Sequence, residues 1–459
     1  MNWPLFLNSL LVSGGTTLLA GATGLAVALW FATAGTRGRW LLILVVAALA
    51  LPPFLVTNTW LDLLGANGKL TRWLPWNIYS IPGAILLLAS LMWPMTTLLV
   101  LGAWRRLEPA QLEGDPALRG GGLLRWLLWP AARVAAGQAA VITFVLALNN
   151  FSVPVILQVP VFPEELWLAF TTRLNDAGAW AAAWPMAGVS LAVAVLLWRR
   201  EIEWPRLTDG VTAEALRRQL GGGWRWTAGI VMLLALAFSL GVPAVQLIAS
   251  SRTWAELPNL FRAAPGVVWN SFAHAAATAT VCVALALVTW RLRPGPMLWL
   301  PFLVPGVLVG RAMIFLFNET AVYGTSTLVV AAFSLRYLAV GWSVVSMALR
   351  SVDHDLTDAA RLAGARGWTL LRHAQWPQIA PRVAAAWYVT YLLCLWDVET
   401  LVLIQPPGGE TLALRIFNLL HYGHNAQVNA LCVTLVGLAV TPLAAWSVWH
   451  RLARRRNGK

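Results

Sequence analysis

The stretch TDAARLAGARGWTLLRHAQWPQIAP, residues 357–381, is a polar segment that lies between two long apolar runs. It predicts a short helix that Thr357 caps and that ends at Gly364, where a left-handed residue is favoured. A second short helix follows, and we expect Pro377 and Pro381 to end it. The segment therefore predicts two short helices, joined by a glycine turn, outside the apolar part of the chain.

The residues of this segment also carry a motif. The order acidic-Ala-Ala-x-x-x-Gly runs from Asp358 through Ala359 and Ala360 to Gly364, and Pro377 follows. A solvated connector with ordinary helix caps is one interpretation. The pattern also resembles the EAA loop of binding-protein-dependent ABC importer permeases, with Asp where that family usually has Glu. The resemblance implies a coupling helix that docks into a groove on an ATPase subunit.

The composition indicates a membrane protein. Of the 459 residues, 59% are hydrophobic and 11% are charged, whereas soluble domains carry about 25% charged residues. We therefore expect an all-α polytopic membrane protein with about eleven transmembrane helices, because apolar runs long enough to cross a bilayer recur along the chain. The predicted spans are 8–34, 40–61, 81–104, 131–157, 179–198, 226–248, 269–290, 297–317, 325–348, 383–404 and 428–449.

The distribution of charge gives the expected orientation of these spans. If residues 357–381 are cytoplasmic, an odd number of spans places the N-terminus outside and the C-terminus in the cytoplasm. Lys and Arg then concentrate on the cytoplasmic side, which is the positive-inside pattern. The net charge of +14 thus needs no nucleic-acid partner, and the lipid bilayer is the expected surrounding.

A second, degenerate copy of the loop lies at 105–130. Glu108, Ala110 and Gly114 reproduce the spacing acidic-x-Ala-x-x-x-Gly, with a proline in place of one alanine. The glycines at 120–122 stand where the other copy is predicted to be helical. We expect this loop to be more flexible and to dock less regularly than the loop at 357–381.

The similarity between the two halves extends beyond the loops. NNFSVPVILQVP (149–160) parallels WDVETLVLIQPP (396–407), and the dipeptide Asn-Ser at 8–9 parallels Asn-Ser at 270–271. A bounded offset of this kind indicates a duplication. Corresponding spans are an even number apart, so both halves have the same orientation, unlike the inverted repeats of many secondary carriers.

The duplication predicts the domain organisation. Residues 1–200 form the first permease unit with about five spans, and residues 226–459 form the second with about six spans and the loop at 351–381. Residues 201–225 are a basic cytoplasmic linker, in which a short helix is predicted near 212–220. The two units are expected to be parallel repeats.

Polar residues occur at matching places in two predicted spans. Asp397 and Glu399 lie toward the outer part of one span, and Asn149, Asn150 and Ser152 occupy the corresponding place in the other half. Charged groups inside a membrane are costly and normally face a bundle interior or a watery cavity. We expect these residues to line a translocation path. The alternative is that they lie at the outer interface and meet water.

Two arginines are also predicted to lie within spans. Arg311 and Arg336 are candidates to pair with Asp397 and Glu399, and Arg311 is a candidate residue of the path. A structural ion pair and a contact with substrate are both open interpretations.

The chain contains no sequence signature of an enzyme. The lysines are Lys69 and Lys459, and neither follows the glycine pattern of a phosphate-binding loop. Cys282, Cys394 and Cys432 fall in apolar spans at no metal-like spacing. We therefore expect no nucleotide site, no metal site and no cofactor, so that any ATP hydrolysis belongs to a separate subunit.

The resemblance covers nearly the whole chain. It looks like two fused permease units of the type I ABC importer class, with the MetI-like fold, and ETLALRIFNLLHYG at 410–423 is most similar to the ferric-iron and thiamine branch. The resemblance implies a bacterial inner membrane protein and transport of a small solute, ferric iron or a thiamine-like cation. It also implies two copies of an ABC ATPase on the two loops, and a periplasmic solute-binding protein on outer loops near 158–178 and 405–425.

Two other classes of function remain open. A secondary carrier or channel would use Asp397, Glu399 and Arg311 for ion coupling and would need no ATPase. A membrane scaffold without transport activity is the third class, but it would not need paired polar residues in equivalent spans. The two similar loops favour the ABC permease.

Overall fold

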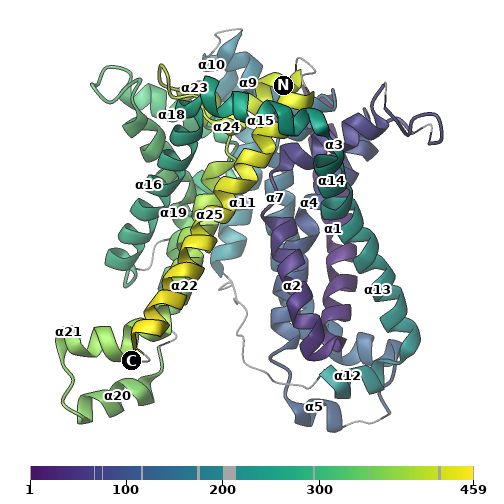
Figure 1. The fold of residues 1–459 in the computed structure, drawn as a ribbon, viewed down its shortest axis with the longest axis vertical. Coiled ribbons are helices and arrows are strands. Elements are labelled where there is room, and N and C mark those ends of the chain that lie inside the picture. The colour runs from purple at the N-terminus through teal and green to yellow at the C-terminus, as the bar shows by residue number, and fades with distance from the viewer. Residues whose placement is uncertain are drawn as a thin grey trace. The chain divides into compact units, whose positions relative to one another are not determined.

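The structure of the chain, a computed structural model, describes residues 2–66, 68–74, 76–114, 117–172, 176–199, 213–292, 295–350, 352–421 and 425–457. Those residues form helices with short connections between them and contain no strand (Figure 1). By its internal contacts the chain divides into unit 1, Met1–Leu257 with Leu419–Val433, and unit 2, Pro258–Asn418 with Thr434–Lys459. The repeat boundaries at 1–200 and 226–459 remain a prediction.

Unit 1 is built around α1 (Trp3–Thr33), which packs against α4 (Ile81–Trp104), α7 (Trp129–Asn149) and α13 (Gly222–Leu236). The linker helix expected near 212–220 is α12, and residues 200–212 lie outside the described part of the chain. The remaining elements of the unit are α2 (Gly35–Leu49), α3 (Pro53–Leu64), α5 (Pro109–Glu113), α6 (Gly121–Leu123), η1 (Leu124–Leu128), α8 (Ser152–Ile156), α9 (Phe162–Thr171), α10 (Asp176–Ala182), α11 (Trp184–Arg199), α12 (Ala213–Leu220), η2 (Ala237–Gly241) and α14 (Val242–Ala249).

The contact between α1 and α4 depends on a glycine. A Cβ atom at Gly24 would lie 2.5 Å from Cβ of Thr96 and 2.7 Å from the carbonyl oxygen of Trp93. The hydroxyl of Thr97 donates a hydrogen bond to the carbonyl oxygen of Gly24 at 3.1 Å. Small residues allow this kind of backbone approach between helices in a membrane, where packing rather than burial from water drives association.

Unit 2 has a similar three-helix centre, in which α16 (Pro265–Thr289), α19 (Ser326–Arg350) and α22 (Trp376–Leu395) pack on one another. Its other elements are η3 (Pro296–Leu298), α17 (Leu300–Leu303), α18 (Gly306–Phe317), α20 (His354–Leu362), α21 (Gly367–Leu370), η4 (Leu371–Gln375) and α23 (Leu401–Ile404). Three helices have residues in both units: α15 (Ser251–Ala263), α24 (Leu412–His421) and α25 (Asn425–Asn457).

The described residues contain seven helices long and apolar enough to cross a membrane, or eight if the pair Trp40–Leu49 and Pro53–Leu64, bent by 84°, is one broken span. Predicted spans 179–198 and 297–317 contain only shorter apolar helices. The prediction of about eleven spans is therefore not confirmed, whereas the all-α polytopic membrane class is. The seven helices are Trp3–Thr33, Ile81–Trp104, Gly121–Asn149, Gly222–Ala249, Pro265–Thr289, Ser326–Arg350 and Gln427–Ser447.

Three prolines each follow a π-helical turn. Pro130, Pro243 and Pro377 are the second residues of α7, α14 and α22, and the π turns η1, η2 and η4 come directly before these helices. A proline lacks the amide hydrogen and its ring clashes with the carbonyl group one turn earlier, and a wider turn relieves that clash.

These turns correct two expectations about the loops. Pro377 and Pro381 do not end a helix, because α22 includes both and continues to Leu395. The glycines at 120–122 were expected to differ from the helical second copy, but Gly121–Leu123 is also helical and leads into the π turn. The stretches before Pro130 and Pro377 thus have the same local structure.

Candidate functional site

The second loop carries α20 and α21, at the end of unit 2 away from α23 and α24 (Figure 1). Helix α20 begins at His354 because Asp353 is its cap: Oδ1 of Asp353 accepts hydrogen bonds from the backbone N–H of Asp355 at 2.9 Å and Leu356 at 3.4 Å. The prediction that Thr357 caps this helix was therefore wrong. Its hydroxyl instead donates to the carbonyl oxygen of Asp353 at 2.8 Å.

Gly364 ends the helix as predicted. Its φ is +89°. The N–H of Gly364 donates to the carbonyl oxygen of Arg361 at 2.9 Å, and the N–H of Ala365 donates to the carbonyl oxygen of Ala360 at 2.9 Å. These two bonds form a Schellman motif, which requires a left-handed residue and so favours glycine. Asp358 lies inside the helix and pairs with Arg361 at 2.9 Å.

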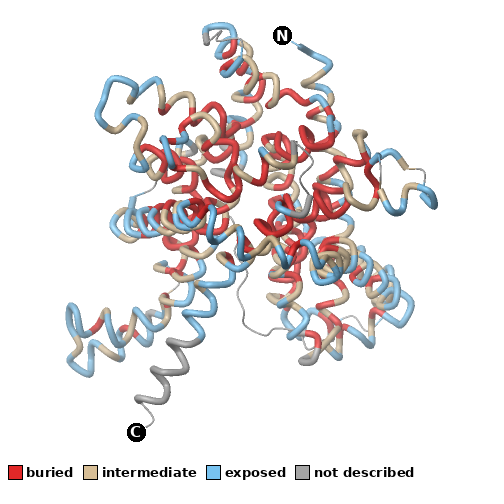
Figure 2. Tube along the Cα trace, turned by 45° about the horizontal axis from the view of Figure 1, so that its top comes forward, coloured by how far each residue is buried: buried red, intermediate tan, exposed pale blue. Residues whose placement is uncertain are grey.

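Large apolar side chains of this loop are exposed. Leu356 is 56% exposed, Leu362 91% and Trp368 71%. Figure 2 shows that most of the loop is exposed along its length. The loop lies outside the helices that are able to cross a membrane, so lipid tails are not the expected cover. A protein surface is the alternative cover for such side chains.

The first loop has a different local structure. Glu108 caps α5 in a capping box with Gln111, whose side-chain oxygen accepts from the N–H of Glu108 at 3.2 Å. Ala110 is exposed. Gly114 has φ −64°, so it is not the left-handed residue that the matching Gly364 is. Both helices begin at an acidic cap, Glu108 or Asp353, although the motif aligns Glu108 with Asp358, and the two helices end differently.

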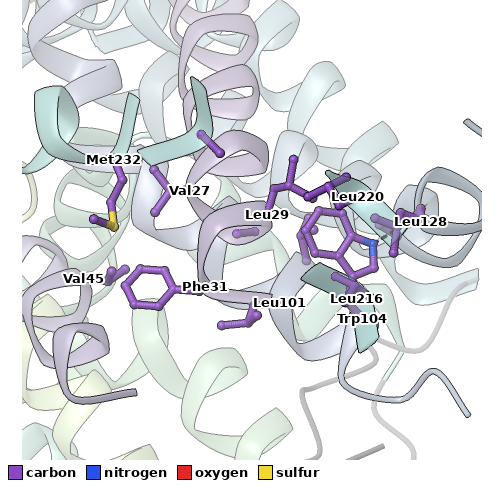
Figure 3. Close-up of a cluster of buried hydrophobic side chains, with 14 of the residues drawn as sticks. Val27, Leu29, Phe31, Val45, Leu101, Trp104, Leu128, Leu216, Leu220 and Met232 are labelled. Atoms are coloured by element: carbon purple, nitrogen blue, oxygen red, sulfur yellow. Dashed lines mark hydrogen bonds between the residues drawn. The ribbon is translucent and has the colours of Figure 1, made fainter. Parts of the chain in front are cut away.

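The linker helix α12 covers one side of the first loop. Leu112 is only 2% exposed and belongs to the same apolar cluster as Leu216 and Leu220 of α12. The side chain of Gln219 donates to the carbonyl oxygen of Leu112 at 2.9 Å, and its backbone carbonyl accepts from Gly120 at 2.9 Å. Figure 3 shows Leu216 and Leu220 beside Trp104 and Leu128 in this cluster. Leu112 corresponds in the motif to Leu362, which is exposed.

A buried ion cluster lies in unit 2. Nη1 of Arg336 donates to Oδ2 of Asp397 at 3.0 Å, and Nη2 donates to Oε2 of Glu399 at 2.7 Å. The side chains are 9%, 1% and 11% exposed respectively. The hydroxyls of Tyr337 and Thr400 donate to Oδ2 of Asp397 at 2.7 and 2.8 Å. Both carboxylate oxygens of Asp397 accept hydrogen bonds, since the N–H of Thr400 donates to Oδ1 at 2.9 Å, and buried charges are tolerated when they are paired and hydrogen-bonded in this way.

The missing side chain of Gly306 makes room for this cluster. A Cβ atom there would lie 2.0 Å from Nη1 of Arg336 and 2.7 Å from Cβ of Glu399. Within the described residues, Asp397 and Glu399 both form their ion pairs with Arg336. Arg311, the other arginine predicted as a partner, lies half-buried on α18.

Unit 1 has a neutral version of the same turn. Oδ1 of Asn150 accepts from the N–H of Val153 at 3.0 Å, as Oδ1 of Asp397 accepts from the N–H of Thr400 at 2.9 Å. Both residues lie where a long helix stops, at Asn149 in α7 and Leu395 in α22, rather than inside a continuous span as predicted. Asn149 and Ser152 are buried, at 3% and 6% exposed.

The Asn-Ser dipeptides at 8–9 and 270–271 make equivalent hydrogen bonds to the backbone in the two units. Asn8 donates to the carbonyl oxygen of Pro160 at 3.1 Å, and Asn270 donates to that of Gly408 at 2.8 Å. The hydroxyl of Ser9 accepts from the N–H of Phe162 at 2.8 Å, and that of Ser271 accepts from the N–H of Leu412 at 2.7 Å. Each pair therefore holds the connection that leads into α9 or α24.

No family model matches the chain. A 2-aminoethylphosphonate transport system permease protein (PhnV) of Salmonella paratyphi A is 28% identical over 260 residues, which are 51% of this chain and 97% of the relative. The chain is similar to transport permeases.

Two polyamine permeases are further relatives. The putrescine transport system permease protein PotI of Escherichia coli is 27% identical over 170 residues, covering 35% of this chain and 59% of the relative. The spermidine/putrescine permease protein PotC of Shigella flexneri is 28% identical over 182 residues, covering 38% and 68%. These relatives support the ABC importer permease class, which hydrolyses no ATP itself. They give no support to the ferric-iron and thiamine branch.

Sequence reasoning found the carboxylates and Arg336 but missed the other parts of both sites. Tyr337, Thr400 and Gly306 carry no signal by themselves, because their role depends on helices that meet only in the folded chain. The cover over the first loop did have a signal. Leu216 and Leu220 are spaced for one face of a helix, in an otherwise polar segment.

Proposed function

We propose that this chain is the membrane permease of an ABC importer and carries both permease units, each coupled to one ATPase subunit through its loop. The observation that carries the proposal is the second loop, in which the capped helix α20 presents Leu356 and Leu362, and the short helix α21 presents Trp368, outside the candidate spans. An amphipathic helix with exposed apolar side chains suits a groove on a partner. Closure of the ATPase pair would move the loops and switch access by rigid-body motion.

Copurification from native membranes in mild detergent tests this function. The wild-type chain should retain a P-loop ATPase near two copies per chain, and Gly364→Asp should retain fewer, because a side chain at φ +89° strains the turn and a charge enters the docking face. Gly324→Asp is the matched control, since Gly324 has φ +70° with open space around it and lies outside the loop. Absence of an ATPase from intact wild-type protein would contradict the proposal.

For the substrate we propose a small aliphatic molecule with a primary ammonium group. The names of the relatives include 2-aminoethylphosphonate, putrescine and spermidine, and a primary amine is what these molecules share. Ferric iron or thiamine, which the resemblance implied, has no such support. Uptake by cells that express the complete system, measured with labelled putrescine, 2-aminoethylphosphonate, ferric iron and thiamine, distinguishes these substrates. Uptake of iron or thiamine alone would contradict the amine.

The polar residues at the helix breaks belong to the proposed translocation path. We place on it Asn149, Asn150 and Ser152 of unit 1 and Asp397 and Glu399 of unit 2, with Arg311 of α18 as a further candidate. Full transport by Asp397→Asn and by Glu399→Gln would remove these two residues from the path. A secondary carrier is less well supported, because both carboxylates that would have to bind the coupling ion are already ion-paired with Arg336.

The proposed membrane orientation and the proposed binding-protein partner are those expected of an ABC importer permease. The N-terminus is outside, the C-terminus is cytoplasmic, and a periplasmic solute-binding protein docks on the outer loops near 158–178 and 405–425. Labelling of cysteines introduced at Asn8 and Trp368, with a reagent that cannot cross the membrane, tests the orientation. Labelling at Asn8 alone is the expected result.

A further inference from the structure

The outward face of α12 is charged and lies next to the first loop. Leu216 and Leu220 point into the apolar cluster, whereas Glu214, Arg217 and Arg218 are exposed. Glu214 and Arg218 form an exposed ion pair at 2.7 Å, one turn apart. The exposed face therefore carries two arginines and one glutamate.

The exposed part of the first loop is continuous with that face. Glu108, Ala110 and Gln111 are exposed on α5, and Gln219 of α12 is hydrogen-bonded to Leu112 at the end of the same short helix. A protein that docks on α5 must therefore lie beside α12. Leu362 of the second loop is exposed and can contact a partner. Its counterpart in the first loop, Leu112, cannot make that contact because α12 covers it.

We propose that α12 forms the second half of the first docking site, so that the two ATPase subunits meet unlike surfaces on this chain. The occupant is the ATPase itself, and the inference rests on the proposed function. The unit 1 surface, α5 with α12, binds through polar and charged contacts, with Arg217 and Arg218 facing acidic groups of the ATPase. The unit 2 surface, α20 with α21, binds through Leu356, Leu362 and Trp368. Charged contacts of this kind weaken with salt, whereas apolar contacts do not.

The test counts ATPase copies per chain by native mass spectrometry of the nucleotide-free complex. Leu362→Asp should leave one copy, bound at the first site. Arg217→Glu combined with Arg218→Glu should also leave one copy, bound at the second site, and all three changes together should leave none. The exchanged arginines are exposed, and the buried leucines of α12 are unchanged, so folding should be preserved.

A charge-matched control is available on another helix. Arg252→Glu with Arg262→Glu makes the same change on exposed positions of α15 and should keep two copies. In added salt the single copy of Leu362→Asp should dissociate before that of the α12 variant. Two copies retained by the α12 variant, or equal salt sensitivity, would overturn the inference. Loss of every copy from the wild type would instead contradict the proposed function.

Discussion

Units 1 and 2 keep the same backbone hydrogen bonds but differ in charge. The serines Ser9 and Ser271 accept from the backbone at equivalent places, and Asn150 and Asp397 make the same turn at the end of a long helix. Among the residues that the structure describes, the ion cluster at this turn is found in unit 2. Ser90, which stands as far from the end of α4 as Arg336 stands from the end of α19, bonds only within its own helix, to Leu87 at 2.7 Å.

The difference teaches which features a duplicated membrane unit must retain. A backbone N–H in a membrane interior needs a partner, because no water is available. Asn and Asp satisfy that need equally well, so either residue is acceptable at the turn. A buried charge is acceptable only with its partners present. The change from Asn to Asp is therefore expected to occur together with an arginine and with a glycine that makes room for it.

The largest expected effect comes from removing the arginine of the cluster. Arg336→Met leaves two carboxylates buried without their cation, and breaking a buried ion pair this way costs about 3–5 kcal/mol. Reversible unfolding in mixed detergent micelles, followed by tryptophan fluorescence, measures this loss. Arg336→Met with Asp397→Asn and Glu399→Gln makes the cluster neutral, as in unit 1, and should recover most of the stability. A triple variant no more stable than the single one would show that charge is not the cause.

The two leucines of the loops should also differ strongly. Leu112→Ala removes a buried side chain and should cost about 2–5 kcal/mol, whereas Leu362→Ala on the exposed loop should stay within about 0.5 kcal/mol of the wild type. The same unfolding measurement compares them, and ATPase binding provides the opposite readout, since only Leu362→Ala should weaken the second docking site. Equal stability costs would mean that α12 does not cover the first loop in solution.

Much of this arrangement was predictable from sequence. Asp397, Glu399 and Arg336 were recognised because charges are rare in apolar runs, and the Asn-Ser dipeptides because they recur. Gly364 was predictable because a left-handed turn favours glycine. The start of α20 was misplaced because several residues near 353–358 are good caps, and only the fold selects Asp353.

The errors in span number have a physical cause as well. Apolar composition alone does not distinguish a continuous span from a helix that stops at a polar turn, and the spans predicted to include Asn150 and Asp397 both contain such a turn. Pro377 was predicted to end a helix because a proline ring clashes with the carbonyl group one turn earlier. The π turn that relieves this clash is not visible in composition.

A smaller effect is expected from filling the space beside the cluster. Gly306→Ala places a methyl group against Arg336 and Glu399, where a Cβ atom would lie 2.0 Å from Nη1 of Arg336. Overpacking of this kind costs about 1–3 kcal/mol. Gly437→Ala on α25, where a Cβ would meet nothing within 4 Å, is the control and should be neutral or slightly stabilising. The prediction fails if both variants unfold alike.

An effect of the same size as that of Gly306→Ala is expected from changing the two serines that the units share. Ser9→Ala leaves the N–H of Phe162 without its acceptor, and Ser271→Ala does the same to the N–H of Leu412. An unsatisfied buried donor costs about 1–3 kcal/mol, and we expect the two losses to agree within about 0.5 kcal/mol, because distances, burial and partners match. Hydrogen exchange at Phe162 and Leu412 gives a local measurement, in which each variant should accelerate only its own amide. A large loss in one unit and none in the other would mean that the two hydrogen bonds have the same geometry but contribute unequally to the free energy of unfolding. The two units would then differ in more than charge.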